Sequence, residues 1–293
     1  MRLLPLLFAS VAAAEMSYTV TATQGGKRID ASHLTLEAIP WKSWTHSRWS
    51  STTNSTSSSS PGAHKSHRSS SGSSEIDKRA PISYSSGWCG ISKRGPSNDP
   101  IKTVVGSFTA PNLRDRTGTY PQFGAAWVGI DGASCQSTLV QAGVTTILNS
   151  NGGQSASAWF EWVPNASYTI PKFPVKAGDW LMVNVTALTK NSAQISITNY
   201  DRDYAMTVTV TGGTTLCQAD ADWIVEDFTS GGKPVPFARF DDIWFEDARA
   251  TTASGGTFGL DNAAMIYLGN SESSAMCIAQ PYDDSNFWCS SQN

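Results

Sequence analysis

The sequence predicts an all-β protein, with its strands arranged as a sandwich of sheets or a barrel. Beyond residue 80, short runs rich in Val, Ile, Thr and aromatic residues alternate with Gly, Asn, Asp and Pro, as strands alternate with turns. No stretch in this region keeps a helical period over three turns. Many short strands without helices are typical of two packed sheets or of one sheet closed on itself.

The first 14 residues predict a secretory signal peptide. Arg2 is followed by the apolar run Leu3–Phe8, and Ala12–Ala14 supplies the small residues of a cleavage site. This run is much shorter than the roughly 20 apolar residues that span a bilayer, and no later segment reaches that length. We therefore expect a secreted (extracellular) protein with no membrane partner, and Asn165 and Asn184 begin N-glycosylation sequons consistent with export.

Residues 15–79 predict a pro-peptide. Residues 15–50 have a mixed composition, whereas residues 51–74 are almost entirely Ser and Thr with scattered basic residues. Such a tract buries too little apolar surface to offset its chain entropy, so we expect a disordered linker. The dibasic pair Lys78-Arg79 then marks a processing site, and cleavage there leaves 214 of the 293 residues (293 − 79) as one mature catalytic domain, residues 80–293.

The two parts of the chain carry opposite charge. Residues 80–293 hold 12 Lys and Arg against 19 Asp and Glu, a balance of −7, whereas residues 15–79 hold 8 against 5, a balance of +3. The parts should attract each other at neutral pH and less so in acid. This pattern fits a pro-peptide that acts as an intramolecular inhibitor, although an acidic surface that only aids solubility explains the domain's charge equally well. No basic patch with interleaved aromatic residues follows residue 80, so nucleic acid is not an expected partner.

Eight strands are predicted beyond residue 80. Three of them lie close together with short polar connections and predict a meander: Asp179–Leu188, Ala193–Tyr200 and Tyr204–Thr211. The other five are Ala125–Ile130, Ser137–Thr146, Ala158–Val163, Trp223–Phe228 and Ala264–Leu268. One folded unit, a monomer, is expected.

Five cysteines indicate an oxidising compartment, and their odd number predicts two disulfides and one thiol. Cys277 and Cys289 are close enough in sequence to clip the C-terminal tail together. A Cys135–Cys217 bridge would close a long loop, worth on the order of 4 kcal/mol in the chain-entropy model. On this arithmetic Cys89 is the unpaired residue, and we expect it to be structural rather than nucleophilic.

All four histidines precede the processing site, which restricts the chemistry of the mature domain. They are His33, His46, His64 and His67. Without imidazole there is no Ser-His or Cys-His pair and no His-ligated zinc. No cofactor or metal is expected, and any catalysis must use carboxylates, amides, hydroxyls or lysines.

Two segments combine polar groups with bulky apolar neighbours. The first runs WVGIDG from Trp127, then Cys135, then LVQAG from Leu139; the second is Cys217 followed by ADWIVEDF from Ala221. Strand alternation places Leu139 and Gln141 on one face, and Ile224, Glu226 and Phe228 on one face. An amide and a carboxylate on a partly dry surface are suited to general acid–base chemistry.

These motifs, in this order and spacing, resemble those of the fungal glutamic peptidases, the eqolisin family of pepstatin-insensitive acid peptidases. The resemblance extends through most of residues 84–293 and includes Trp88, the segment AWFEW from Ala158 and VPFA from Val235. It implies a sandwich of two packed antiparallel sheets of the concanavalin A-like lectin/glucanase type. It also implies a secreted acid endopeptidase that acts on protein and peptide substrates.

Carried over residue by residue, the resemblance implies that Gln141 and Glu226 are catalytic and that Cys135 and Cys217 form a disulfide. The expected substrate-binding residues lie in or beside the matching motifs: Trp88, Trp127, Asp131, Trp159, Glu161 and Phe228. This chain departs from the family pattern at Ser157, where close relatives carry an acidic residue, and at Cys89, where they tend to have glycine. Both differences bear on substrate preference more than on the reaction.

Rival functions rest on the same residues. Trp127, Trp159 and Trp162 could form a core or line a sugar-binding groove, and Glu161 with Glu226 could serve a glycosidase. A secreted carbohydrate-binding or glycoside-hydrolase sandwich is therefore the main alternative. Pepsin-like chemistry would need two Asp-Thr/Ser-Gly motifs, and Asp131-Gly132-Ala133 is not one.

Overall fold

The computed structural model of the 293-residue chain describes residues 16–31, 34–42, 49–50 and 81–293. The predicted signal peptide, the Ser/Thr tract 51–74 and the dibasic pair lie outside the described residues and stay predictions. In the described ranges the elements are strands and one 3-10 helix, Glu272–Ser274, so no helix there is long and apolar enough to span a membrane. The all-β prediction is confirmed.

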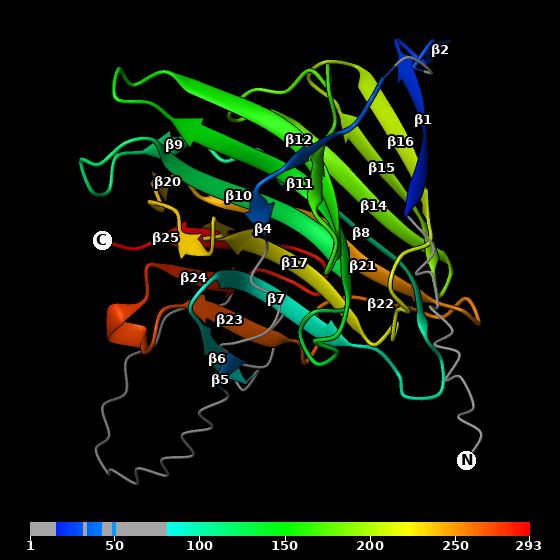
Figure 1. The fold of residues 1–293 in the computed structure, drawn as a ribbon. Helices are drawn as coiled ribbons and strands as arrows, with labels where there is room; N and C mark the ends of the chain where they lie inside the picture. Colours follow the sequence, from blue (N-terminus) through cyan, green and yellow to red (C-terminus); the bar gives the residue numbers. More distant parts are fainter. Residues whose placement is uncertain (1–15, 32–33, 43–48, 51–80) are drawn as a thin grey trace, which may run out of the picture.

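The strands form two antiparallel layers, which Figure 1 shows from one side. The first sheet runs in the order β6 (Ile82–Ser85), β23 (Ala264–Leu268), β7 (Trp88–Arg94), β17 (Asp220–Glu226), β10 (Gln122–Ile130), β11 (Leu139–Leu148), β12 (Gln154–Val163) and β13 (Ser167–Thr169). All its neighbours pair antiparallel except β6 with β23.

The second sheet runs in the order β24 (Cys277–Pro281), β25 (Phe287–Ser291), β21 (Ile243–Thr252), β8 (Ile101–Thr109), β14 (Trp180–Thr189), β15 (Ser192–Asn199) and β16 (Tyr204–Thr211). Short pairings complete the structure: β22 (Thr257–Phe258) with β21, β9 (Leu113–Arg114) with β20 (Arg239–Phe240), and β18 (Thr229–Ser230) with β19 (Lys233–Pro234).

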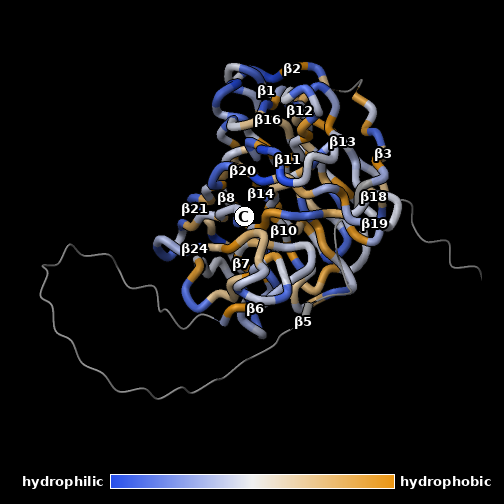
Figure 2. The backbone as a smooth tube through the Cα atoms, turned by 90° about the vertical axis from the view of Figure 1, so that its left-hand side faces the viewer, coloured by the Kyte–Doolittle hydropathy of each residue, from blue (hydrophilic) through white to orange (hydrophobic). Residues whose placement is uncertain are grey.

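The main hydrophobic core lies between the two sheets. Strand alternation gives β16 the buried positions Tyr204, Met206, Val208 and Val210, and the first sheet contributes inward residues such as Trp223. In Figure 2, hydrophobic stretches run through β10 and its neighbours, whereas hydrophilic stretches gather in outer turns. All seven residues of β17 are buried, because its outer face is covered as well.

The segment before residue 50 also forms strands, which the sequence analysis did not predict. Strand β1 (Ser17–Gln24) pairs with β16 and forms a hairpin with β2 (Lys27–Ile29). Farther along, β3 (Glu37–Ile39) pairs with β13, β4 (Trp41–Lys42) with β18, and β5 (Trp49–Ser50) with β6. The alternation of Tyr18, Val20 and Ala22 with Ser and Thr is a period-2 signal that could have identified β1.

The predicted strands agree with the structure to within a few residues at their ends. Tyr204–Thr211 and Ala264–Leu268 have the predicted bounds. Strands β7, β8 and β21 were not predicted. Strand β7 is buried over most of its length, and β21 carries a bulge where it pairs with β8, so β7 and β21 do not show a clean alternation of buried and exposed residues.

The cysteine assignment from sequence was wrong in part. The structure contains the Cys135–Cys217 disulfide, but the second bridge joins Cys89 to Cys277, and Cys289 is the buried free thiol. In the β24–β25 pair, Cys277 lies opposite Ser291 and Cys289 lies opposite Ala279, so the two are not direct partners. The Sγ atoms of Cys89, Cys277 and Cys289 all lie within 4.8 Å of one another, and sequence distance could not show that β7 supplies the partner.

The cysteine arrangement predicts the outcome of thiol labelling. Because Cys289 is fully buried and burial raises the pKa of its thiol, alkylation of the native protein should modify no cysteine. After unfolding without reductant, one alkyl group should appear, and peptide mapping should place it on Cys289. Labelling of Cys89 instead would contradict the Cys89–Cys277 bridge.

Candidate active site

The candidate site lies on the outer face of the first sheet, and strand register decides which residues share that face. Glu226 on β17 pairs with Trp88 on β7 and with Ala125 on β10. Gln141 on β11 pairs with Gly129 on β10 and with Glu161 on β12. Because Ala125 and Gly129 are an even number of residues apart on one strand, Glu226 and Gln141 face the same side of the sheet.

Two indole groups hold the Glu226 carboxylate. Trp127 Nε1 donates a hydrogen bond to Oε2 at 2.7 Å, and Trp88 Nε1 donates to Oε1 at 3.3 Å. The two rings pack edge to face with their centroids 4.9 Å apart. Each carboxylate oxygen thus accepts a hydrogen bond from an oriented neutral donor, which fixes the direction of the side chain.

A carboxylate also orients the Gln141 amide. Gln141 Nε2 donates to Glu161 Oε2 at 2.7 Å, and both side chains are buried. The amide nitrogen carries two hydrogens, so one of them remains for another acceptor. Gln141 Oε1 is buried and has no hydrogen-bond partner among the described residues.

Two glycines on this face leave no room for a side chain. A Cβ at Gly143 would lie 2.1 Å from the Ala126 carbonyl oxygen and 2.6 Å from Trp127 Cβ. A Cβ at Gly129 would lie 3.0 Å from Gln141 Cβ. Glycine at these positions therefore permits the close packing that positions Trp127 and Gln141.

A second apolar cluster covers the outer face around Glu226, and we call it the outer cluster. Its buried members are Trp88, Ala125, Trp127, Ala133, Leu139, Trp159, Val163, Ile224, Phe228, Val235 and Ile266. Ile39, from the segment before the predicted processing site, and Phe123 pack against it half-buried. The Trp159 indole Nε1 is buried and has no hydrogen-bond partner among the described residues.

Two aspartates fasten the ends of β10 and β17 to each other. Asp131, at the end of β10, accepts hydrogen bonds of 2.7 to 2.9 Å from the backbone N–H groups of Cys217, Gln218 and Ala219. Asp220, at the start of β17, accepts from the backbone of Ser134 and Cys135 at 2.7 and 2.9 Å.

The Cys135–Cys217 disulfide ties the same two loops. We call these contacts the reciprocal clamp. The hydrogen-bond acceptors of Asp131 are thus used by the protein itself, and its role as a substrate-binding residue stays a prediction.

Buried aspartates surround this part of the sheet. Burial raises the pKa of Asp131 to about 6, with a further contribution from the charge of Asp220. Burial raises the pKa of Asp222 well above its usual range. Burial, aided by the neighbouring Glu226 charge, raises the pKa of Asp227 to about 8. These carboxyls are protonated in acid and costly to ionise near neutrality.

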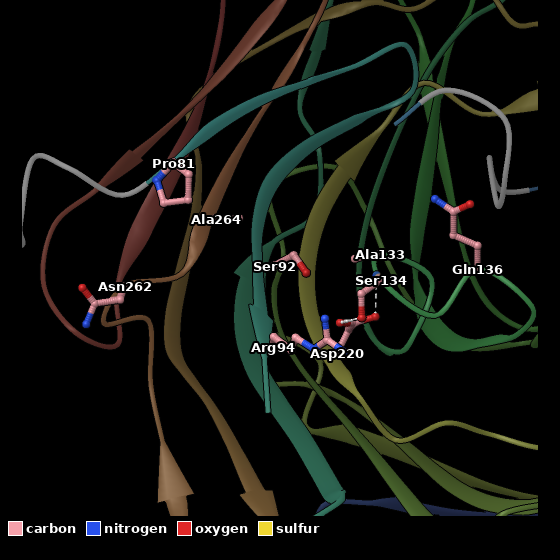
Figure 3. Close-up of a pocket in the computed structure, with 9 residues that line it drawn as sticks. All are labelled: Pro81, Ser92, Arg94, Ala133, Ser134, Gln136, Asp220, Asn262 and Ala264. Carbon is pink, nitrogen blue, oxygen red and sulfur yellow. Dashed lines mark hydrogen bonds between the residues drawn. The ribbon is translucent and has the colours of Figure 1, made fainter. Parts of the chain in front are cut away.

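A pocket of about 400 Å³ opens on the same outer face, beside Ser92, Arg94 and Asp220. Figure 3 shows Pro81 and Asn262 on one side of it and Ser134 with Asp220 on the other, where a dashed line marks their hydrogen bond. Because Ser92 and Asp220 lie toward the opposite strand ends from Trp88 and Glu226, the pocket is separate from the two indoles.

The described residues contain two groups of three potential metal ligands, and neither forms a convincing metal site. They are Cys89, Cys277 and Cys289, and Asp131, Cys135 and Cys217. Each group contains sulfur atoms of a disulfide, which lack the thiolate that binds metal.

Comparison with known proteins identifies the family. The profile described as the Peptidase A4 family matches residues 86–291. The chain belongs to this family. It is 33% identical over 202 residues to aspergillopepsin-2 of Aspergillus niger, covering 62% of this chain and 70% of that protein. It is 30% identical over 192 residues to scytalidopepsin B of Scytalidium lignicola, with the same coverages.

Solved structures agree with this assignment. Scytalido-glutamic peptidase in complex with a transition state analog inhibitor matches with a TM-score of 0.62 and 25% identity, over 71% of this chain and 98% of that one. Aspergilloglutamic peptidase from Aspergillus niger matches with a TM-score of 0.55 and 31% identity, over 58% and 99%. The chain is thus a glutamic-type endopeptidase, and the predicted resemblance and sandwich fold are confirmed.

The structure brings most of the sequence-predicted site residues of this glutamic peptidase together. Trp88, Trp127, Trp159 and Phe228 belong to the outer cluster, while Glu161 contacts Gln141. Sequence reasoning missed Asp222, although its place two residues before Ile224 on the same strand face was a usable signal. It also missed Ile39, because β3 has no local pattern that points to this face.

The buried aspartates predict a loss of stability as pH rises. In each case the folded-state pKa lies above the unfolded value near 3.9, so the folded state binds the proton more tightly. Their favourable contribution is complete below about pH 4. It is lost as pH rises toward 6 for Asp131 and toward 8 for Asp227, on the order of 3 and 6 kcal/mol.

Urea unfolding at pH 4, 6 and 8 measures this loss. Asp227→Asn should reduce the fall in unfolding free energy between pH 4 and 8, because the amide does not ionise, whereas the exposed Asp247→Asn should leave it unchanged. A stability that is constant or rises over this range would contradict the account.

Proposed function

We propose that this protein is a secreted acid endopeptidase in which Glu226 and Gln141 together cleave the peptide bond. The observation that carries the proposal is their placement: both are buried on one face of the first sheet, each held by an oriented hydrogen bond, in a chain of the Peptidase A4 family. Family membership favours this reading over a carbohydrate-binding or glycosidase function.

The proposed reaction needs a base, an oxyanion donor and an acid. Ionised Glu226 takes a proton from water as the water oxygen attacks the carbonyl carbon of the substrate. The free N–H of Gln141 donates to the developing oxyanion, and Gln141 Oε1 accepts from the attacking water. When the carbon–nitrogen bond breaks, protonated Glu226 returns the proton to the departing amine.

The hydrogen bonds around the dyad support these roles. Two neutral indole donors orient the Glu226 carboxyl for proton transfer. Glu161 holds one amide hydrogen of Gln141 and fixes the direction of the other. We propose that Trp88, Trp127, Trp159 and Phe228 provide the apolar surface on which the peptide lies, with Glu161 and Asp131 at its edges.

Substitution at the dyad tests the mechanism. Glu226→Gln should lower kcat on a protein substrate by at least about 10³-fold, because general acid–base transfer is lost. Gln141→Ala should lower it by about 10² to 10³-fold, the cost of removing one oxyanion donor. The assay uses the matured enzyme at about pH 4 with pepstatin present.

Exposed residues of the same types supply the matched controls. Glu246→Gln and Gln194→Ala lie on the exposed surface of the second sheet and should retain full activity. Undiminished hydrolysis by the Glu226→Gln variant would contradict the proposed mechanism.

We further propose that the pro-segment inhibits the enzyme by covering the site. Strand β3 pairs with β13 and β4 pairs with β18, so residues 37–42 join the two margins of the outer face. In Figure 1 this blue segment passes in front of β12 and β11 to reach β4. At the end of β3, Ile39 packs against the outer cluster, where a substrate side chain would lie.

The contact of Ile39 with the outer cluster predicts how the pro-segment acts in trans. A peptide of residues 16–50 should inhibit the mature enzyme, and Ile39→Asp should raise its inhibition constant at least tenfold, because a carboxylate is costly to bury in an apolar cluster. Thr19→Asp, at an exposed β1 position, is the matched control and should change inhibition little.

The pH dependence of this inhibition tests the charge argument. Inhibition should weaken between about pH 6 and pH 3, since protonation of the domain's carboxylates removes part of the attraction to the basic segment. Equal inhibition at both pH values would count against it.

A further inference from the structure

We propose that pro-segment residues 17–36 stay bound to the mature domain after cleavage behind Arg79, as a second, non-covalent chain. Residues 37–42 would then be the inhibitory part, and residues 17–36 a retained part that completes the fold. The inference rests on the proposed maturation at Lys78-Arg79. It concerns the edge of β16 that does not pair with β15, and it assigns that edge one partner, the chain's own N-terminal hairpin.

The backbone ladder is the first support. Strand β1 pairs with β16 without interruption over eight residues, from Ser17 opposite Thr211 to Gln24 opposite Tyr204. Gly25 N also donates to the Asp203 carbonyl at 3.0 Å, and the Ser17 and Thr211 hydroxyls lie 2.7 Å apart. Without β1, strand β16 would be the bare edge of the second sheet, with unpaired N–H and C=O groups along its length.

The apolar contacts are the second support. Ala22, Ala31 and Leu36 are buried in the main core between the two sheets. Four further residues pack against that core half-buried: Tyr18, Val20, Ile29 and Leu34. Loss of the segment would open this side of the core to water, which favours its retention.

Tyr18 connects the hairpin to the first sheet as well. Its ring lies 6.2 Å from that of Tyr168 on β13, and its hydroxyl accepts a hydrogen bond from Leu36 N at 3.2 Å. Residues 17–36 thus contact the margins of both sheets.

The third support is chemical composition. The paired segments SYTVTATQ and YAMTVTVT contain no Asp, Glu, Lys, Arg or His. The charged groups Lys27, Arg28, Asp30 and Glu37 of the pro-segment, and Asp203 in the turn before β16, lie outside the residues that pair in the ladder. Acid that weakens the charge attraction of the pro-segment therefore leaves the ladder intact.

Native mass spectrometry of the cleaved precursor tests the inference. A unique protease site placed within the Ser-rich tract 51–74 allows cleavage that does not depend on the enzyme's own activity. At pH 4, the domain should carry one fragment that contains residues 17–36. Ala22→Asp should lower the bound fraction at least tenfold, because it places a carboxylate in the core, whereas the neighbouring Thr21→Asp faces solvent and should leave it unchanged.

Synthetic peptides keep the test decisive if the Ala22→Asp precursor does not fold. A peptide of residues 16–36 should bind the isolated mature domain at least tenfold more tightly than its Ala22→Asp version, and it should not inhibit hydrolysis. A domain that appears alone in the mass spectrum, with equal binding of the two peptides, would overturn the inference. A domain that retains the fragment but hydrolyses nothing would instead contradict the proposed function.

Discussion

The strand register of β7, β17, β10, β11 and β12 is the constraint on which the rest of the structure depends. Side chains alternate between faces, so a slip of one residue in β17 would move Glu226 into the core and Val225 to the outer face. The reciprocal clamp holds this register where β10 ends and β17 begins. Asp131 binds the backbone of the loop that leads into β17, and Asp220 binds the backbone of the loop that follows β10. The Cys135–Cys217 disulfide closes the same junction covalently.

The consequence of that register is a sheet buried on both faces. The inner face packs on the second sheet, and the outer face carries the outer cluster, so the carboxylates of β17 are removed from water. Asp222 lies within this strand and Asp227 directly follows Glu226 at its end, and burial raises the pKa of both. Such a sheet is most stable when its aspartates are protonated, which matches the proposed work of the enzyme in acid.

The N-terminal segment makes two kinds of contact with the sandwich. Its hairpin extends the second sheet through neutral hydrogen bonds and core contacts, while Ile39 covers the outer cluster. The first kind depends little on pH, whereas the overall charge attraction between the basic segment and the acidic domain weakens on acidification. Inhibition and structural support can therefore respond differently to the same change of pH.

Strands with a clear alternation of apolar and polar residues could be predicted from the sequence. The meander β14–β15–β16 alternates clearly and has short turns, so its strands could be predicted. The motifs around Gln141 and Glu226 indicated the family. The Cys89–Cys277 bridge and the contact of Ile39 with the outer cluster could not be predicted from the sequence, because each depends on which distant strands become neighbours. Glycines such as Gly143 are informative only once the carbonyl of Ala126 is seen to lie where a Cβ would be.

A crystal structure of the mature domain with a peptide-based transition-state analogue would show where the reacting carbon binds. The tetrahedral centre of the analogue should lie between Glu226 and Gln141, with one of its oxygens accepting a hydrogen bond from Gln141 Nε2. Binding of that centre away from both side chains, for example in the pocket beside Arg94 and Asp220, would contradict the proposed mechanism.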